Sequence, residues 1–289
     1  MPISTYPILQ QKPQSSVHER ASVVSHRLAV IDLDGTLFGP NKQISPENRR
    51  ALDRLREAGI EPVFASGRHH LNIVRFAQQT GPMSWVVSTS GAVVRHAVTE
   101  EQLHELTLPE AEALAVYEAS RREKLAMIVY HRDGIFIDAE CEATRVYAAR
   151  ASWKPQHGDL AQLAASGLQK ILLSESPEIL AKAGPSLESA FAHRLYVVWT
   201  EKDIVEFLSP HANKAVGVEA LASKLGIAPD RVWAFGDGNN DVEMLEWAGF
   251  SVAMAHGQPR AHRAARAVSP PGPPETAFAR AVDLAFASA

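Results

Sequence analysis

Apolar and polar positions alternate in blocks along the chain, and these blocks predict strands and helices in turn. From Arg27 the order is a strand in RLAVIDL, a helix in SPENRRALDRLREAG, a strand in IEPVFAS, a further helix, and a strand in SWVVSTS. The first helix has Ser45 as its N-cap and places Leu52 and Leu55 on its inner side. Strands that are apolar throughout and separated by helices indicate a parallel sheet covered on both faces.

The same order returns near the C-terminus, with a helix in NKAVGVEALASKLG, a strand in RVWAFGD, a helix in NDVEMLEWAG and a strand in FSVAMA. The region between differs, because LAMIVYHR and IFIDA predict a hairpin and a second passage of helix and strands follows. We therefore predict an α/β fold: a Rossmann-like doubly wound parallel sheet from residues 27–91 and 203–289, with an inserted α+β cap over 92–202. Residues 1–26 lack apolar periodicity and predict a flexible tail.

Composition and charge exclude several classes of partner. Hydrophobic residues make up 46% and charged residues 21% of the 289 residues, and the formal net charge is −4. No basic surface is therefore expected for nucleic acid, and no polybasic cluster for a membrane. The N-terminus has no apolar signal segment, and the single cysteine, Cys141, fits a reducing compartment. We expect a cytoplasmic protein, a monomer or weak dimer.

Two aspartates stand two positions apart at the end of the first strand, in LAVIDLDGTLF. Residues i and i+2 of a strand point the same way, so Asp32 and Asp34 can both face the edge where open α/β sheets bind ligands. Two carboxylates so close raise each other's pKa unless a cation or a shared proton relieves the repulsion. The pair therefore calls for a metal, a proton, or both, although an Asp-Gly turn at the surface would carry the same residues.

Two other strand ends add chemistry of the same kind. VFASGR delivers Ser66, Gly67 and a cation, a combination suited to a phosphate group, although Ser66 could also begin a helix. VWAFGDGNND places Asp237 and Asp241 within five residues, among glycine and asparagine. Hard oxygen ligands after a buried strand suit Mg²⁺.

An isolated lysine, Lys214, stands at the start of a predicted helix in SPHANKAVGVEAL. The helix dipole favours anions at that end, so a lysine gains nothing from it. Helix N-termini also bind phosphate, and the ammonium group and the dipole could serve one anion together. A solvated surface lysine is the alternative.

These four segments, in this order, resemble the motifs of the haloacid dehalogenase superfamily of aspartyl phosphotransferases. DLDGTL, SGR, the lysine and GDGNND are similar to motifs I to IV, and the resemblance covers about residues 27–270. The insertion after SWVVSTSGAVV resembles the type IIB cap of the Cof-like phosphatases, where an NGA segment often stands in place of SGA at 90–92. One departure is His256, which stands where such members commonly carry an Asn-Ala pair.

The resemblance implies a role for each matched residue. Asp32 would be the nucleophile that forms an aspartyl-phosphate, and Asp34 would be the general acid and then the general base. Mg²⁺ would be held by Asp32, Asp237 and the backbone carbonyl of Asp34, while Asp241 would bind through water or orient the other ligands. The phosphoryl oxygens would be surrounded by four residues: Ser66, Gly67, Lys214 and Asn240.

On this basis we expect a Mg²⁺-dependent phosphatase, a hydrolase acting on a small phosphorylated metabolite such as a sugar phosphate. A narrow phosphatase for sucrose, trehalose or mannosylglycerate phosphate is one alternative, and a non-catalytic phospholigand-binding module on the same fold is another. Retention of both Asp32 and Asp34 argues against the module, because binding needs no second carboxylate for proton transfer. The ester itself would be selected by the cap.

Overall fold

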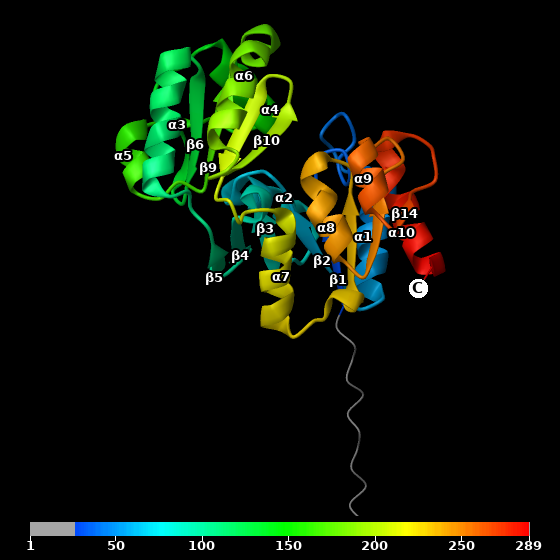
Figure 1. Cartoon of the computed structure of the whole chain (residues 1–289). Helices are drawn as coiled ribbons and strands as arrows, with labels where there is room; N and C mark the ends of the chain where they lie inside the picture. Colours follow the sequence, from blue (N-terminus) through cyan, green and yellow to red (C-terminus); the bar gives the residue numbers. More distant parts are fainter. Residues whose placement is uncertain (1–26, 289) are drawn as a thin grey trace, which may run out of the picture.

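The computed structural model describes residues 27–288, which form two sheets surrounded by helices (Figure 1). One sheet has the strand order β14-β13-β12-β1-β2-β3-β4-β5 and the other the order β10-β11-β9-β6-β7-β8. We call the first sheet with its helices the core, and the second with its helices the cap. This architecture confirms the predicted α/β core with an inserted α+β cap. The tail predicted over residues 1–26 lies outside the described residues.

The core sheet is parallel from β14 to β3 and ends in two antiparallel strands, β4 and β5. Parallel strands need crossover helices, which is why strands and helices alternate in this part of the sequence. The strands are β1 (Arg27–Ile31), β2 (Ile60–Ala65), β3 (Trp85–Ser88), β4 (Val93–His96), β5 (Gln102–Glu105), β12 (Val232–Gly236), β13 (Phe250–Ala253) and β14 (Ala267–Val268).

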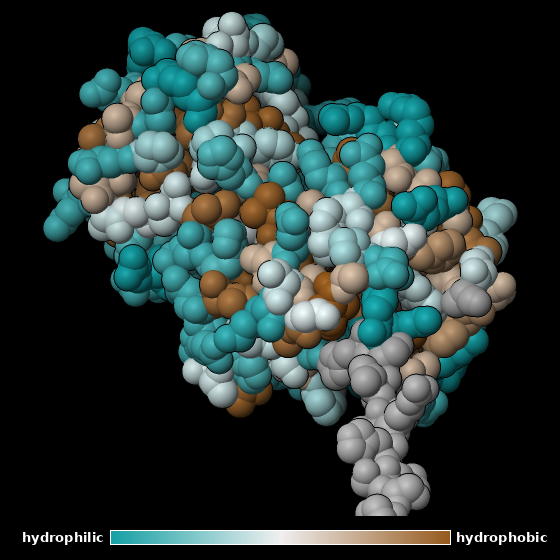
Figure 2. Space-filling view, turned by 60° about the horizontal axis from the view of Figure 1, so that its bottom comes forward, coloured by the Kyte–Doolittle hydropathy of each residue, from teal (hydrophilic) through white to brown (hydrophobic). Residues whose placement is uncertain are grey.

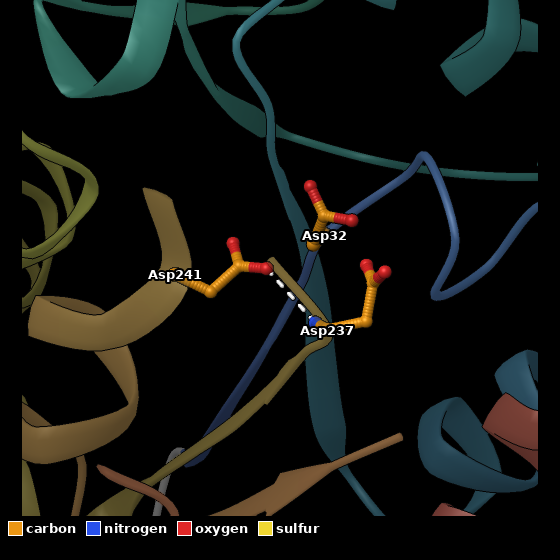
Figure 3. A group of neighbouring side chains, drawn as sticks. All are labelled: Asp32, Asp237 and Asp241. Carbon is orange, nitrogen blue, oxygen red and sulfur yellow. Dashed lines mark hydrogen bonds between the residues drawn. The ribbon is translucent and has the colours of Figure 1, made fainter. Parts of the chain in front are cut away.

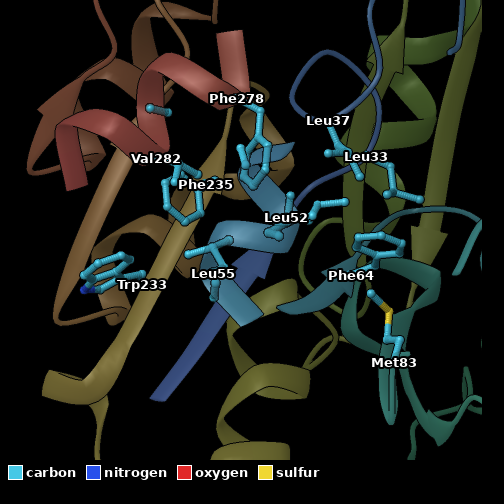
Figure 4. Close-up of a cluster of buried hydrophobic side chains, with 14 of the residues drawn as sticks. Leu33, Leu37, Leu52, Leu55, Phe64, Met83, Trp233, Phe235, Phe278 and Val282 are labelled. Carbon is cyan, nitrogen blue, oxygen red and sulfur yellow. The ribbon is translucent and has the colours of Figure 1, made fainter. Parts of the chain in front are cut away.

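Helices cover both faces of the core sheet because successive strand residues point to opposite sides. In β1, Ile31 packs on the side of α1, α2 and α10, whereas Leu28 and Val30 pack on the side of α7, α8 and α9. Leu52 and Leu55 of α1 are buried in the first cluster, as predicted (Figure 4). The helices are α1 (Pro46–Glu57), α2 (His70–Thr80), α7 (Lys214–Leu225), α8 (Val242–Trp247), α9 (Pro259–Ala264) and α10 (Ala277–Ser288), with 3₁₀ turns η1 (Thr89–Gly91), η2 (Pro229–Arg231), η3 (Asn239–Asp241) and η4 (Pro274–Thr276).

The cap sheet is antiparallel apart from the pairing of β7 with β8, and it contains the predicted hairpin as β6 and β7. Apolar residues on one face of this sheet pack beneath α3, α5 and α6. Its elements are α3 (Glu110–Glu123), β6 (Ala126–His131), β7 (Gly134–Ile137), α4 (Glu142–Ala151), β8 (Gln156–His157), α5 (Leu160–Ala165), β9 (Lys170–Ser174), α6 (Pro177–Phe191), β10 (Tyr196–Glu201) and β11 (Ile204–Leu208).

Sheet membership differs from the expected boundaries at both ends of the insertion. The strands β4 and β5 extend the core sheet although they follow residue 92, and β11 belongs to the cap sheet although it follows residue 203. An antiparallel strand needs only a short turn after its neighbour. The alternation of apolar residues in such a strand is the same whichever sheet it joins, so the sequence pattern did not separate the two.

The described surface offers no broad apolar patch. On the face in Figure 2, apolar residues stand in small groups between hydrophilic ones. The exposed large apolar side chains of residues 27–288 come from separate parts of the fold: Val98, Val146, Ile179 and Val268. Within these residues, no helix has both the length and the apolar character that crossing a membrane requires.

Candidate active site

The candidate site lies at the carboxyl ends of three neighbouring parallel strands, β12, β1 and β2. Asp237, Asp32 and Ser66 directly follow these strands, so the parallel topology brings together residues that are far apart in the sequence. They line a pocket of about 270 Å³ between the core and the cap. The edge of the sheet thus gathers the predicted strand-end segments, as the parallel fold requires.

Three carboxylates form the floor of the site (Figure 3). Asp32, Asp237 and Asp241 each offer an oxygen within 4.8 Å of the others. Asp241 is oriented by the backbone, because its Oδ2 accepts hydrogen bonds from the N–H groups of Asp237 (2.9 Å) and Gly238 (2.8 Å). Oδ2 of Asp32 is buried and has no hydrogen-bond partner among the described residues. Oxygen donors and an unpartnered buried carboxylate oxygen fit a hard divalent cation such as Mg²⁺.

The protonation of this floor follows from burial and from like charge. Burial raises the pKa of Asp32 well above its usual range; the charge of Asp241 adds to the rise and the charge of Lys214 opposes it. Burial and the charge of Asp241 likewise raise the pKa of Asp237 to about 7. A bound cation would remove the repulsion and favour the ionised carboxylates, which would link metal binding to proton release.

Lys214 is fully buried among the carboxylates rather than solvated at the surface. Its Nζ lies 2.6 Å from Oδ1 of Asp32 and 2.5 Å from Oδ1 of Asp241. Burial alone would lower the pKa of this lysine, but the two carboxylates raise it above its usual value, so the ammonium stays charged. In this structure Lys214 therefore neutralises acidic residues, and its contact with a phosphate stays a prediction.

Asp34 stands apart from the three carboxylates of the floor. Arg68 binds it through two hydrogen bonds, Nε to Oδ2 at 2.6 Å and Nη2 to Oδ1 at 2.7 Å, and Lys42 adds a third at 2.8 Å. Burial would raise the pKa of Asp34, but these two cations lower it to about 2. Asp34 is thus ionised, and it is a weak base while these two cations hold it. Before it can donate a proton, Arg68 and Lys42 must release it.

Three predicted phosphate-site residues, Ser66, Gly67 and Asn240, line the same pocket as Asp32 and Asp237, whereas Lys214 is not among its lining residues. Ser66 is buried, and its hydroxyl accepts a hydrogen bond from the N–H of Arg68 at 3.3 Å. A β-carbon added at Gly67 would lie 3.2 Å from Oγ of Ser90 and 3.9 Å from Nδ2 of Asn240. Gly67 therefore leaves room at a narrow point of the pocket, next to Asn240.

Two contacts shape the backbone beside Asp32. Gly35 has φ +88°, and a β-carbon there would lie 2.4 Å from Oδ2 of Asp237, so only glycine fits. Thr36 donates from its hydroxyl to Oδ1 of Asp237 at 3.1 Å. His256, at the departure from the usual sequence, donates from Nε2 to the carbonyl of Gly35 at 2.8 Å. The loop after β13 is thereby tied to the turn after β1.

One face of the cap sheet forms the roof of the pocket. Alternate strand residues of three strands line it: Tyr130 of β6, Lys170 and Leu172 of β9, and Ile204 and Glu206 of β11. Residues between them, such as Ile171, Val205 and Phe207, pack in the cluster beneath α3, α5 and α6. In β6, β9 and β11 this is the period of two that strands impose. The strand β10, whose pairing with β11 is irregular after Trp199, contributes the four consecutive residues 198–201. The core thus contributes a sheet edge to the site, and the cap contributes a sheet face.

The polar groups of this roof bond to one another, and the sequence interpretation missed them. The hydroxyls of Tyr130 and Tyr147 lie 2.7 Å apart. Nζ of Lys170 lies 3.1 Å from each carboxylate oxygen of Glu206, and both side chains are buried. A charged residue within each of the apolar segments QKILLSES and DIVEFL was the available signal, because charges are seldom buried in a strand without a partner.

Comparison with known proteins agrees with this geometry. A profile of haloacid dehalogenase-like hydrolases matches residues 29–273. The chain is 29% identical over 234 residues to the HMP-PP phosphatase of Cronobacter sakazakii, covering 81% of this chain and 86% of that one. A crystal structure of a haloacid dehalogenase-like hydrolase from Bacteroides thetaiotaomicron superposes with a TM-score of 0.81 at 27% identity, covering 90% of this chain and 100% of that one. The subclass IIB sugar phosphatase BT4131 has a similar fold, with a TM-score of 0.79 at 18% identity over 90% of this chain and 99% of that one.

Proposed function

Because the chain belongs to the haloacid dehalogenase-like hydrolases and is a phosphatase, we propose that it hydrolyses a small phosphate monoester with Mg²⁺ bound at Asp32, Asp237 and Asp241. The family and the enzyme class expected from the sequence are thereby confirmed. The substrate, the metal and the residue roles are the proposal.

The observation that carries the proposal is the excess of negative charge on the floor of the pocket. Three carboxylates face one ammonium group, Lys214, and Oδ2 of Asp32 has no partner among the described residues. Such a cluster is costly unless protons or a cation relieve the repulsion, and the unpartnered oxygen of Asp32 supports a cation. Bound Mg²⁺ would supply positive charge to these carboxylates and to the phosphoryl oxygens.

The proposed reaction has two displacements at phosphorus. An oxygen of Asp32 attacks, the bond from phosphorus to the leaving oxygen breaks, and Asp34 gives that oxygen a proton. Water then attacks the phosphorus, Asp34 takes its proton, the bond to Asp32 breaks, and inorganic phosphate leaves. The pKa of about 2 for Asp34 adds a requirement: Arg68 and Lys42 must turn from Asp34 before the first step, and the substrate phosphate offers them another anion.

Ser66, Gly67 and Asn240 are the proposed contacts of the phosphoryl oxygens, because they line the pocket beside Asp32. Donors fixed in place before the reaction stabilise the charge of the transition state without reorganisation. Lys214 contributes by holding Oδ1 of Asp32, which leaves Oδ2 unpaired.

The cap supports a substrate whose leaving alcohol is uncharged, such as a sugar. The cations that the cap contributes to the pocket are already paired, Lys170 with Glu206 and Arg150 with Asp203. A second anionic group on the substrate therefore meets no unpaired cation on the roof, whereas hydroxyl groups can bond to such polar pairs.

The first test is phosphate release from para-nitrophenyl phosphate with Mg²⁺, with EDTA, and with Asp32→Asn. We expect release that needs both the metal and Asp32. Asp53→Asn, which changes an exposed aspartate of α1, is the matched control and keeps full activity. Release that survives the loss of Asp32 would overturn the mechanism.

The second test compares glucose 6-phosphate with 6-phosphogluconate, which adds a carboxylate at the far end of the same carbon chain. We expect kcat/KM to be higher for the sugar phosphate, because the roof offers its second anion no free cation. Preference for the carboxylate-bearing ester would overturn the proposed substrate class and leave the Asp32 chemistry standing.

A further inference from the structure

The cap rests on residues 67–72, which follow β2 and which we call the docking segment. Three of its side chains donate hydrogen bonds to backbone carbonyls of the cap: Arg68 and Asn72 to Ala151, and His69 to His131. A fourth contact runs in the opposite direction, from Nζ of Lys170 to the carbonyl of Gly67 at 2.6 Å. The docking segment, which begins at the proposed phosphate site, is therefore also hydrogen-bonded to the cap.

Lys170 is an unusual residue for a strand of the cap, because its ammonium group is buried. It is 1% exposed, it is paired with Glu206, and it lies 4.5 Å from the centre of the Tyr130 ring. Burying two charges costs desolvation that a pair of apolar side chains avoids, so a buried ion pair is weak evidence for stability. The role of this pair is therefore to be found in the other contact of Lys170, its hydrogen bond to the carbonyl of Gly67.

That contact fixes one peptide plane in the proposed phosphate site. The peptide between Gly67 and Arg68 has its carbonyl bonded to Lys170 and its N–H bonded to Oγ of Ser66. One end of the plane is thus held by the cap and the other by the core. Any displacement of the cap from the docking segment would take Lys170 away from Gly67, and the carbonyl end of the peptide would lose its partner.

We propose that Lys170 is a positioning residue, which orients the Gly67 peptide so that the phosphate site is complete only while the cap rests on the docking segment. This inference rests on the proposed function, since it assigns a task within that site. Lys170 acts through Gly67, and Glu206 keeps the ammonium group aligned and neutralised. Closing the cap over a substrate and tightening the grip on its phosphate are then one event.

A different role for the same pair would be a direct contact with the leaving alcohol. The two roles predict different kinetics. If Lys170 positions Gly67, it influences binding of the phosphate group that all substrates share. Its loss should then lower kcat/KM by the same factor for every ester and weaken inhibition by inorganic phosphate. A contact with the leaving group would affect esters unequally and would leave inorganic phosphate unchanged.

The test uses the full chain with three changes. Lys170→Met combined with Glu206→Met removes the contact with Gly67 without leaving a single buried charge. Glu206→Gln keeps Lys170 and an acceptor for it but removes the buried countercharge, so it measures how far the carboxylate of Glu206 aligns Lys170. Arg194→Met breaks the cap ion pair with Glu112, which lies outside the pocket lining, and controls for cap stability.

The readouts are the inhibition constant of inorganic phosphate and the kcat and KM for para-nitrophenyl phosphate and glucose 6-phosphate, all with Mg²⁺. In the double variant we expect phosphate inhibition to weaken about tenfold and kcat/KM to fall about tenfold for both esters, the size of one lost charged hydrogen bond. Arg194→Met should stay within about twofold. Glu206→Gln should show a smaller loss than the double variant, again equal for phosphate and both esters, because Lys170 still reaches Gly67 but is less well aligned. The Mg²⁺ dependence should not change.

Unchanged phosphate inhibition in the double variant, or a loss confined to one ester, would overturn the proposal. If circular dichroism shows that this variant is unfolded, Lys170→Gln with Glu206→Gln replaces it, because glutamine is too short to reach Gly67 and keeps a hydrogen-bonded pair. Should the wild-type protein release phosphate from no ester, the proposed function fails. Calorimetric binding of inorganic phosphate then still decides the role of Lys170.

Discussion

The core and the cap arrange their buried charges in different ways. At the edge of the core sheet, two of three neighbouring carboxylates share one lysine, and one carboxylate oxygen has no partner among the described residues. On the face of the cap sheet, the buried lysine has its own carboxylate. Unbalanced charge marks the place where a cation and a phosphate are expected, and balanced charge marks the wall where the proposed function places the rest of the substrate.

The difference follows from the two kinds of sheet. The carboxyl ends of parallel strands all lie at one edge of the sheet. Residues just after the strands, such as Asp32 and Asp237, are therefore brought together there by the topology alone. Antiparallel strands end at both edges, and their pocket residues must come from one face, at every second position, as Ile204 and Glu206 do. Each of the following predictions tests one side of this comparison.

The largest effect is expected from removing the only ammonium that the described residues place among the floor carboxylates. Lys214→Met leaves Asp32 and Asp241 buried without their cation, so the metal-free protein should lose about 3–5 kcal/mol of its unfolding free energy. Mg²⁺ should restore more stability to the variant than to the wild type, since it supplies the missing positive charge. Urea unfolding with EDTA and with Mg²⁺ measures both.

Lys224→Met, on the exposed side of the same helix, is the control and should cost under about 1 kcal/mol. Phosphate release by Lys214→Met should fall by about 10²–10³-fold, because Asp32 loses its orienting partner. Equal stabilisation of wild type and variant by Mg²⁺ would contradict the charge imbalance that distinguishes the core from the cap.

The next largest loss of unfolding free energy is expected at Gly91, whose backbone packs against the start of α7 and so helps to position Lys214. Gly91 has φ +91°, and a β-carbon there would lie 1.9 Å from the carbonyl oxygen of Asn213. Gly226, at the other end of α7, has φ +65° and no atom within 4 Å of that position. Gly91→Ala should cost about 2–4 kcal/mol more than Gly226→Ala in thermal or urea unfolding. Similar costs for both would mean that the close approach is easily relaxed.

The sequence predicted the edge of the core far better than the face of the cap. Asp32, Ser66 and Asp237 were found because each follows an apolar strand, and parallel topology then dictates that they meet. The face of the cap sheet that meets the core depends on how the cap docks, which no local pattern encodes, so Lys170 and Glu206 were missed.

The hydrogen-bond partners of the predicted residues could not be predicted from the local sequence pattern either. Lys214 was expected near a phosphate from the helix start alone, yet its partners in this structure are carboxylates from two distant segments. Arg68 was seen as a cation of the phosphate loop, and its double hydrogen bond with Asp34 depends on the packing of β1 against β2.

Acidification should weaken the junction between core and cap. Burial lowers the pKa of His69 to about 4, and its neutral ring accepts from the N–H of Leu71 while donating to the carbonyl of His131. Between pH 6.5 and 4 the unfolded chain binds a proton that the folded chain does not, so stability falls as the pH falls, by on the order of 3 kcal/mol for this group. His69→Asn keeps an N-cap and cannot titrate. Its stability, measured by urea unfolding from pH 7 to 4.5, should fall less steeply than that of the wild type, and parallel curves would exclude His69 as the cause.

The smallest effect is expected from a paired cation on the roof of the pocket. Arg150 is partly exposed and bound to Asp203 through two hydrogen bonds, so Arg150→Met should cost under about 1 kcal/mol of stability. Because the proposed function places this residue beside the leaving group rather than the phosphate, the variant should change the ratio of kcat/KM between glucose 6-phosphate and para-nitrophenyl phosphate by about two- to tenfold. Inhibition by inorganic phosphate should stay as in the wild type. If phosphate inhibition weakened as well, the division between a core that binds phosphate and a cap wall that meets the alcohol would fail at this residue.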